Sequence, residues 1–325
     1  MRILHHPSTD SSFNLAAEEW LLRNSDEDVF MLWRNARAVI VGRNQNTLAE
    51  INVDFVRENG ISVVRRLTGG GAVFHDLGNL NFTFIKLGNA PGLLDFRRFA
   101  QPMVEALQAL GLPCGFTGRN DLEVSGRKIS GNAQYMHRDR VLHHGTLLFS
   151  ADLEVLSSVL RPGEAKYAGK AVKSVRSRVG NIADFLDHPM SIEEFMAFLL
   201  ERMAGGPVLP DLDLRREEAE AIHLLADEKY RSWEWNYGHV PDYAFARETR
   251  TDGGVLDIRL DVRKGRLEDI RILGDYFGVR DVKELEDRLR GCPHTRTDLT
   301  ARLGEVALEA YMQNVSREVF LDCLF

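Results

Sequence analysis

Short apolar runs bounded by Gly, Asn or Asp dominate the first half of the chain and predict β-strands. These runs are rich in Val, Ile and Phe, and they lie at residues 29–34, 38–43, 62–67, 72–77, 81–87 and 141–150. The tetrapeptide DLGN between two of the runs has the composition of a hairpin turn. A second hairpin is expected in the stretch 122–136, with its turn at Ser125-Gly126. The first half is therefore predicted to be rich in β-sheet, with helices interspersed.

Four segments of the chain have helical periodicity or helical end signals. Leu and Ala recur at helical spacing over residues 12–24, and the stretch 95–111 ends at a glycine, as helices often do. The run 191–206 starts with Ser and has Glu three residues later, which is a capping-box pattern. Residues 217–230 read as a charged helix.

The last part of the chain has a pattern of its own. Aromatic residues, Gly and Pro interrupt the helical pattern at 232–243, and the chain then alternates strictly towards a turn at Lys264-Gly265. Two helical stretches, 282–291 and 299–313, follow. The pattern predicts one domain over residues 1–243 and a small α+β domain over residues 246–325.

Composition and charge narrow the class of protein. The 325 residues are 44% hydrophobic and 27% charged, which is typical of a globular protein with a sizeable core. The net charge of −7 argues against a broad nucleic-acid-binding face. The first residues lack the apolar core of a signal peptide and no apolar run approaches 18 residues, so we expect neither a signal peptide nor a membrane-spanning helix. The scattered Cys114, Cys292 and Cys323 predict neither disulfides nor a thiolate zinc site, so we expect a cytoplasmic protein.

Three consecutive glycines, Gly69 to Gly71, directly follow the sequence RRLT. Glycine reaches positive φ and lets a ligand approach the main chain, and consecutive N–H groups can form an anion-binding nest. The stretch lacks both the GK[ST] of a Walker A loop and a GxGxxG turn into a helix. Arg65 and Arg66 should point to opposite faces of their strand, so only one can face a ligand. A glycine-rich hairpin with a surface arginine pair remains an alternative.

The stretch GRNDLEVSGRKISGNAQ, residues 118–134, offers a lysine and a carboxylate. Lys128 lies just after a tight turn and just before Ser130-Gly131, close to flexible backbone. Asp121 is a candidate ligand for a divalent metal beside a phosphate, because Mg²⁺ favours one or two carboxylates with phosphate oxygens. Lys128 as a solvated charge and Asp121 as a turn cap are the alternatives.

Two further stretches carry polar chemistry. His143 and His144 are adjacent, so on a strand they face opposite ways and cannot share a metal ion. We favour hydrogen-bonding roles there, with Gly145 and Thr146 close to a ligand. The segment KSVRSRVGNI, 173–182, is typical of a mobile loop that orders on phosphate, or of a solvated basic loop.

Together, the order, spacing and identity of these stretches resemble lipoate–protein ligases, which attach lipoic acid to a lysine of a lipoyl domain. RRLTGGGAVFHDLGN is the most specific element, followed by GRKISGNAQ and HHGTLLFSADL. SVRSRVGNI resembles the adenylate-binding loop of the family. WEWNYGHVPDY and the tail resemble the junction and accessory domain of the large bacterial ligases. The resemblance covers most of the chain.

The resemblance implies an α+β fold: a mixed β-sheet sandwich with flanking helices, shared with biotin ligases, plus a small accessory α+β domain. It implies an enzyme that uses ATP and Mg²⁺ to activate lipoate or octanoate as lipoyl-AMP, releases pyrophosphate, and transfers the acyl group to a lysine. The implied partners are lipoyl domains of 2-oxoacid dehydrogenase complexes or the glycine-cleavage H-type protein. We expect a monomer that binds neither nucleic acid nor membrane.

The resemblance also implies residue roles. Lys128 and Arg66 are expected to be catalytic, and Asp121 to lie near the metal ion. The residues expected to bind substrate or adenylate are Gly69, Gly70, Gly71, Ala72, Val73, Phe74, Gly131, His144, Thr146, Ser174 and Arg178. Physical logic agrees, because a carboxylate and a triphosphate repel each other, and cations, a metal ion and an N–H nest offset that repulsion. The apolar lipoyl chain needs a dry tunnel, for which 72–77 and the opening helix are candidates.

Three alternative functions stay open on the sequence alone. A transferase of the same fold would hold the acyl group as a thioester on Cys114 without ATP, although a small buried thiol is the simpler interpretation. A non-adenylating protein would bind lipoyl-AMP without turnover. A biotin ligase fits less well, because its arginine-rich glycine loop differs from RRLTGGGAVFHD.

Overall fold

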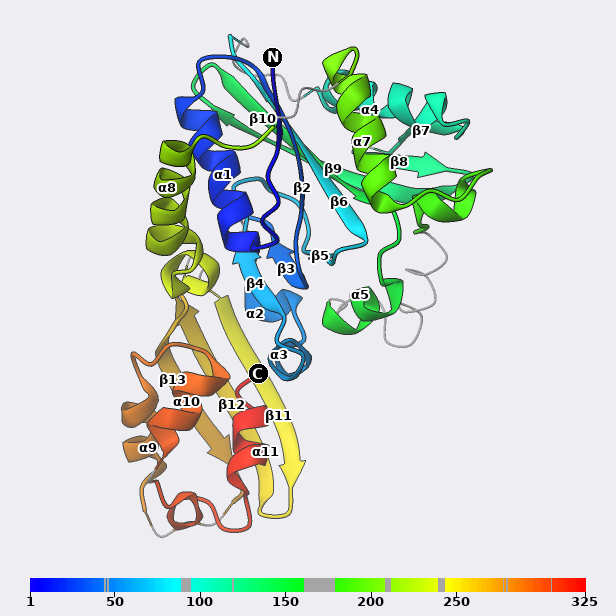
Figure 1. The fold of residues 1–325 in the computed structure, drawn as a ribbon. Coiled ribbons are helices and arrows are strands. Elements are labelled where there is room, and N and C mark those ends of the chain that lie inside the picture. Colours follow the sequence, from blue (N-terminus) through cyan, green and yellow to red (C-terminus); the bar gives the residue numbers. More distant parts are fainter. Residues whose placement is uncertain are drawn as a thin grey trace. The chain divides into compact units, whose positions relative to one another are not determined.

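The computed structural model describes residues 1–325 except 44, 46, 89–94, 119, 161–178, 208–211, 239–242, 277, 279 and 305. The chain divides into two compact units, Met1–Asn236 and Tyr237–Phe325 (Figure 1). None of the described helices is long and apolar enough to cross a membrane.

A seven-stranded sheet forms the centre of the first unit, in the order β1-β2-β6-β10-β9-β8-β7. In chain order its strands are β1 Arg2–His5, β2 Val29–Arg34, β6 Asn79–Lys86, β7 Cys114–Thr117, β8 Asp121–Val124, β9 Arg127–His137 and β10 Arg140–Leu148. Only the β1–β2 pairing is parallel, and the others are antiparallel. The predicted hairpin between β8 and β9 turns at Ser125 and Gly126, which both have positive φ.

A three-stranded sheet of order β4-β3-β5 lies opposite one face of the large sheet. Its strands are β3 Ala38–Val41, β4 Ser62–Arg65 and β5 Val73–His75. Ile40 and Val64 of this sheet share one buried core with Trp33, Ile85 and Leu142 of the large sheet. The two sheets therefore face each other, which confirms the predicted mixed sandwich.

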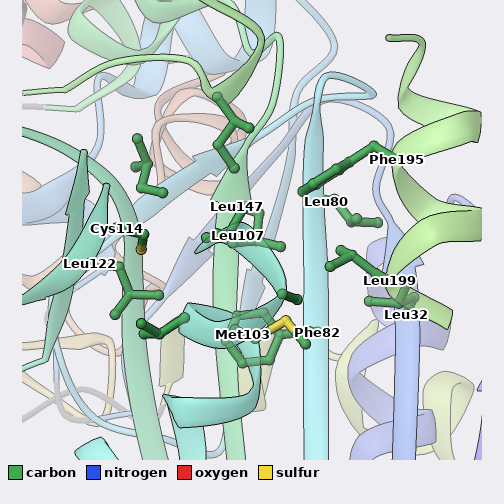
Figure 2. Packing of buried hydrophobic residues seen from close by; sticks show 14 of the residues in the cluster. Leu32, Leu80, Phe82, Met103, Leu107, Cys114, Leu122, Leu147, Phe195 and Leu199 are labelled. Atoms are coloured by element: carbon green, nitrogen blue, oxygen red, sulfur yellow. The ribbon is translucent and has the colours of Figure 1, made fainter. Parts of the chain in front are cut away.

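Helices flank the sandwich, as predicted. Helix α1 (Ser11–Asn24) packs beside α8 (Arg216–Leu225), while α4 (Phe96–Ala109) and α7 (Ile192–Ala204) cover the outer face of the large sheet. Figure 2 shows this outer core, in which sheet residues such as Leu32, Leu80 and Phe82 pack against the two helices. The predicted capping box of Ser191 and Glu194 is present at α7. Shorter helical segments are α2 Thr47–Glu50, α3 Val53–Glu58, α5 Leu153–Val159, η1 Ile182–Phe185, η2 Ala226–Tyr230 and η3 Glu234–Gly238.

The second unit is an antiparallel sheet of β11 (Tyr243–Thr251), β12 (Gly254–Arg263) and β13 (Arg266–Gly274) with short helices. The predicted turn at Lys264-Gly265 joins β12 to β13, and both residues have positive φ. Its helices are α9 Val282–Leu289, α10 Arg296–Leu303, η4 Leu308–Ala310 and α11 Arg317–Asp322.

One helix prediction in this unit is wrong in extent. A single helical stretch was expected over 299–313, but α10 begins at Arg296, behind the Thr295 cap, and ends at Leu303. The next residue is Gly304, and glycine is a poor helix former because it loses the most backbone entropy on folding.

Candidate active site

A cavity of about 200 Å³ lies in the first unit, lined by residues of both sheets and of α1. One part of its wall is apolar and is formed by Leu15, Trp33, Ile40, Val73 and Ala133. Another part is formed by the glycine loop, Gly69 to Gly71, and by Lys128. The fold therefore brings a bare backbone, an ammonium group and an apolar slot to the same space, although they come from separate segments of the chain.

The glycine loop is held through its carbonyl groups by the guanidinium of Arg66. Nη2 of Arg66 donates to the carbonyl oxygens of Gly69 at 2.7 Å and Gly71 at 2.8 Å. Gly70, with φ of +95°, makes the turn between them in a region that L-residues avoid. None of the three loop N–H groups has a hydrogen-bond acceptor within the described parts of the chain. The carbonyls are thus tied down while the N–H groups stay available for an anion.

Arg66 itself is almost fully buried, and most of its N–H groups donate hydrogen bonds within the protein. Besides the loop carbonyls, its Nη1 donates to Ile40 O at 3.0 Å and its Nε to Thr68 Oγ1 at 2.9 Å. Burial lowers the pKa of the guanidinium to about 10, and the carboxylate of Glu18 acts in the opposite direction. Arg66 therefore stays charged at neutral pH, and its geometry is that of a clamp on the loop.

Arg65 points away from the cavity, which confirms that only one of the two arginines can face a ligand. It is completely buried. Its guanidinium donates to the carbonyl oxygens of Gly42, Arg43 and Gln45, at 2.9, 2.9 and 2.8 Å. It also binds Trp235 O at 2.9 Å. Arg65 thereby fastens the turn after β3 to the end of the first unit.

Lys128 lies on β9 with its ammonium beside the carboxylate of Asp121. The Nζ to Oδ1 distance is 2.8 Å, and both side chains are about one-third exposed, 37% and 31%. A Cβ on Gly131 would lie 3.2 Å from the Lys128 Nζ, so the missing side chain at Gly131 gives the ammonium its place. Asp121 does not line the cavity and reaches it only through Lys128. The described residues contain no cluster of three or more His, Cys, Asp or Glu side chains suited to a metal ion.

Strand β10 presents His144 and Thr146 to the cavity and His143 to the opposite face. His144 Nδ1 lies 2.9 Å from Glu18 Oε1, and Thr146 Oγ1 accepts from the N–H of Gly131 at 3.3 Å. The ring of His143 stacks on Phe99, and burial lowers the pKa of His143 to about 3. The expectation that the two histidines face opposite ways is confirmed.

Among the predicted site residues in the described part of the chain, Phe74 and Asp121 do not line the cavity. Phe74 does not line it and instead packs with Val39 and Val41 in a separate core, because successive residues of a strand face opposite sides and Val73 takes the cavity side. The side chain of Phe74 thus faces away from the cavity, and its role in binding the adenylate stays a prediction. Ser174 and Arg178 lie outside the described residues. The remaining predicted lining residues are at the cavity wall, namely Gly69, Gly70, Gly71, Ala72, Val73, Gly131, His144 and Thr146.

Sequence reasoning missed several polar residues between the sheets. His75 and Asn81 line the cavity, and among the described residues their Nε2 and Nδ2 atoms have no hydrogen-bond partner. Burial, with the nearby charge of Arg66, lowers the pKa of His75 to about 3. Glu18, only 3% exposed, binds His144 from α1. Its spacing of three from Leu15, which lines the cavity, was the one available signal.

Cys114 lies in the outer core and not at the cavity. Figure 2 shows its side chain among Leu107 and Leu122. Burial raises the pKa of this thiol to about 11, whereas a nucleophilic cysteine needs an accessible thiolate. The structure therefore offers no support for a thioester on Cys114.

The sequence of this chain matches two protein-family models and a known relative. Residues 10–204 match the lipoyl protein ligase A/B catalytic domain, and residues 240–324 match the bacterial lipoate protein ligase C-terminus. A lipoate–protein ligase of Bacillus subtilis is 42% identical over 97% of this chain and 97% of its own length. These matches cover the glycine loop, Lys128 and the tail alike.

Solved structures agree with the sequence matches. The bipartite lipoate protein ligase of Thermoplasma acidophilum, described with its E2 lipoyl domain, has a TM-score of 0.63 and 32% identity, over 74% of this chain and 96% of that chain. A lipoate–protein ligase A bound with ATP has a TM-score of 0.61 and 31% identity, over 73% of this chain and 98% of that chain. With its glycine loop and lysine beside an apolar slot, and with relatives matching nearly its full length, this chain belongs to the lipoate–protein ligase family.

Proposed function

We propose that this member of the family is an ATP-dependent ligase that activates lipoate or octanoate as an acyl adenylate and transfers the acyl group to a lysine of a lipoyl domain. The observation that carries the proposal is the shared cavity of the glycine loop, Lys128 and the apolar slot. A similar structure binds ATP, and another is described with its E2 lipoyl domain.

In the first half-reaction, a carboxylate oxygen attacks the α-phosphorus of ATP and pyrophosphate leaves. Two anions must meet, so their repulsion has to be offset where the new bond forms. The N–H groups of Gly69 to Gly71 and the ammonium of Lys128 supply that compensation. Lys128 acts as a mobile point charge, which can follow the phosphate as bonds change. The apolar slot holds the acyl chain and keeps water from the adenylate.

Arg66 supports this step indirectly. Its hydrogen bonds to Gly69 O and Gly71 O leave few donors for a phosphate, so we assign it to holding the loop. This refines the expectation that Arg66 is catalytic. Its buried positive charge still favours an anion in the cavity.

Asp121 would hold a magnesium ion only together with phosphate oxygens of the substrate, because the described residues form no cluster of three metal-binding side chains. Asp121 is half-buried, and one of its carboxylate oxygens binds Lys128 while the other has no partner among the described residues. One carboxylate together with phosphate oxygens is the ligand set that Mg²⁺ commonly takes. Bound there, the ion would neutralise phosphate charge.

In the second half-reaction, the neutral ε-amine of the acceptor lysine attacks the acyl carbonyl of the adenylate and AMP leaves. Ser174 and Arg178 remain predictions for closing over the adenylate. We assign the catalytic role to residues 1–243 and an accessory role to residues 246–325. We place the enzyme in the cytoplasm, because its three cysteines are unpaired and buried, as suits a reducing compartment. A monomer stays our expectation.

The test of this function is ATP–pyrophosphate exchange measured with lipoate, octanoate and biotin side by side. We expect exchange with lipoate or octanoate and background rates with biotin, followed by acylation of an apo lipoyl domain only when ATP is present. Acylation from an acyl-carrier-protein donor without ATP would contradict the proposal. Tight binding of lipoyl-AMP without any exchange would instead identify a non-adenylating protein.

A further inference from the structure

A continuous path of buried hydrogen bonds joins α1 to the glycine loop. Glu18 accepts from His144 Nδ1, with distances of 2.9 Å to Oε1 and 3.0 Å to Oε2. The other ring nitrogen of His144, Nε2, lies 2.8 Å from Thr68 Oγ1. Thr68 in turn accepts from Arg66 Nε at 2.9 Å. Arg66 then clamps the carbonyls of Gly69 and Gly71.

The donors and acceptors along this path fix its directions. Arg66 can only donate, so the Thr68 hydroxyl oxygen accepts from it and the hydroxyl hydrogen is left to point at His144. A neutral imidazole with its proton on Nδ1 accepts that hydrogen at Nε2 and donates to Glu18. An imidazolium would leave the Thr68 hydrogen without an acceptor within the described part of the chain. The neutral tautomer is therefore the one that satisfies every member of the path.

Glu18 is fixed from a second side as well. The hydroxyl of Thr83, on β6, donates to Glu18 Oε1 at 2.6 Å, and Trp33 Nε1 donates to Thr83 Oγ1 at 2.9 Å. The carboxylate is thus held between two strands and cannot swing without breaking these bonds. It also balances the buried charge of Arg66 across two neutral groups, since a lone buried guanidinium would be costly.

We infer that Glu18 is a positioning residue for ATP: through His144 and Thr68 it sets the orientation of Arg66, and through Arg66 the presentation of the glycine-loop N–H groups. This inference rests on the proposed function. Glu18 does not line the cavity, so it acts on the phosphates only through its neighbours. When the path is cut, the guanidinium of Arg66 loses one fixed partner and the loop carbonyls are no longer held inward.

The test compares KM for ATP with KM for lipoate in the pyrophosphate exchange reaction. Glu18→Gln removes the charge with little change of shape, and Thr68→Val removes the hydroxyl that links His144 to Arg66. Each should raise KM for ATP about tenfold, the scale of a lost charge-assisted hydrogen bond, and should raise KM for lipoate much less. Thr68→Ser, which restores the hydroxyl, should return KM for ATP to near the wild-type value.

Glu19 provides the matched control. It is the next residue of α1 and equally buried, but it binds Lys229 Nζ at 2.6 Å and Tyr230 OH at 2.7 Å, outside the path. Glu19→Gln should leave KM for ATP unchanged per folded active site, although it lowers stability. Glu18→Gln and Thr68→Val should be strongly non-additive in a double-mutant cycle, and Glu19→Gln and Thr68→Val should be additive.

The outcomes separate this inference from the proposed function. An inactive wild-type protein in the exchange assay would overturn the proposed function itself. An active wild type, with KM for ATP within about twofold in both Glu18→Gln and Thr68→Val, would overturn only the positioning role. A lowered melting temperature together with additive kinetic effects would also overturn the positioning role of Glu18, because a purely structural role predicts that result.

Discussion

His143 and His144 lie next to each other on β10 and point to opposite faces of the seven-stranded sheet. On the cavity face, His144 links Glu18 to Thr68, beside the glycine loop. On the outer face, His143 stacks on Phe99, and its ring nitrogens form hydrogen bonds with the buried side chains of Gln134 and Asn132. A histidine on the cavity face therefore belongs to the site, whereas a histidine on the outer face belongs to the packing.

The same division occurs in two other adjacent pairs of the first unit. Arg66 clamps the glycine loop while Arg65 fastens backbone carbonyls away from the cavity. On α1, Glu18 binds His144 on the cavity side, whereas Glu19 binds Lys229 and Tyr230 elsewhere. In this protein, the role of a side chain depends more on the face on which it lies than on its residue type.

The largest expected effect comes from removing the cavity-side cation. Lys128→Ala should slow adenylate formation about a thousandfold, the scale of losing one preorganised charge donor in a transition state. The fold should persist, because the Lys128 side chain is 37% exposed. Single-turnover pyrophosphate release measures the change. Arg127→Ala, on the adjacent exposed residue of β9, is the control, and near-normal release by Lys128→Ala would refute the assigned role.

Replacing each of the two histidines by itself tests whether the two faces of the sheet have different roles. His143→Leu should lower the free energy of unfolding by about 2 kcal/mol, because two buried amide groups lose their partner. It should leave KM for ATP and KM for lipoate unchanged. His144→Leu should instead raise KM for ATP about tenfold through Thr68 and Arg66. Urea unfolding and exchange kinetics on both variants decide the matter, and a reversed pattern would contradict the division of roles.

The sequence predicts elements that depend on neighbouring residues better than elements that depend on contacts between distant parts of the chain. Strands β2 to β6 and β8 to β10, the Ser125-Gly126 turn and the Ser191 capping box follow from local alternation and turn chemistry, and they are observed. Two four-residue strands of the large sheet, β7 and β1, are not predicted from the pattern, and β1 gains its structure from parallel pairing with β2. That pairing is non-local and leaves little local pattern.

The site shows the same limit. The glycine loop and Lys128 can be recognised from residue identity, and alternation with Val73 places the Phe74 side chain on the face away from the cavity. Glu18 looked like an ordinary polar residue of a helix. Its burial follows from the contact of α1 with the sandwich, and its spacing of three from Leu15 is the one local signal of that contact.

The buried histidines also predict how stability depends on pH. The pKa values of His75 and His143 are lowered to about 3, so both stay neutral in the folded protein while the unfolded chain takes up protons below pH of about 6.5. The unfolded state then binds more protons, and stability is lost as pH falls from there towards 3. Each histidine should contribute up to about 1.4 kcal/mol per pH unit. Unfolding measured between these limits should give a shallower slope for His143→Leu, and an unchanged slope would contradict the assignment.

The smallest expected effect concerns Cys114, on the packing side of the comparison. Cys114→Ser should keep the ATP-dependent acylation rate within about twofold, because the thiol packs as a small apolar group. The buried hydroxyl should cost about 1 kcal/mol of stability, since the core around Leu107 and Leu122 is apolar. Acylation of an apo lipoyl domain and urea unfolding measure the two effects. If acylation stopped in Cys114→Ser while the variant stayed folded, the cysteine would belong to the chemistry and the two faces of the sheet would not be divided as described.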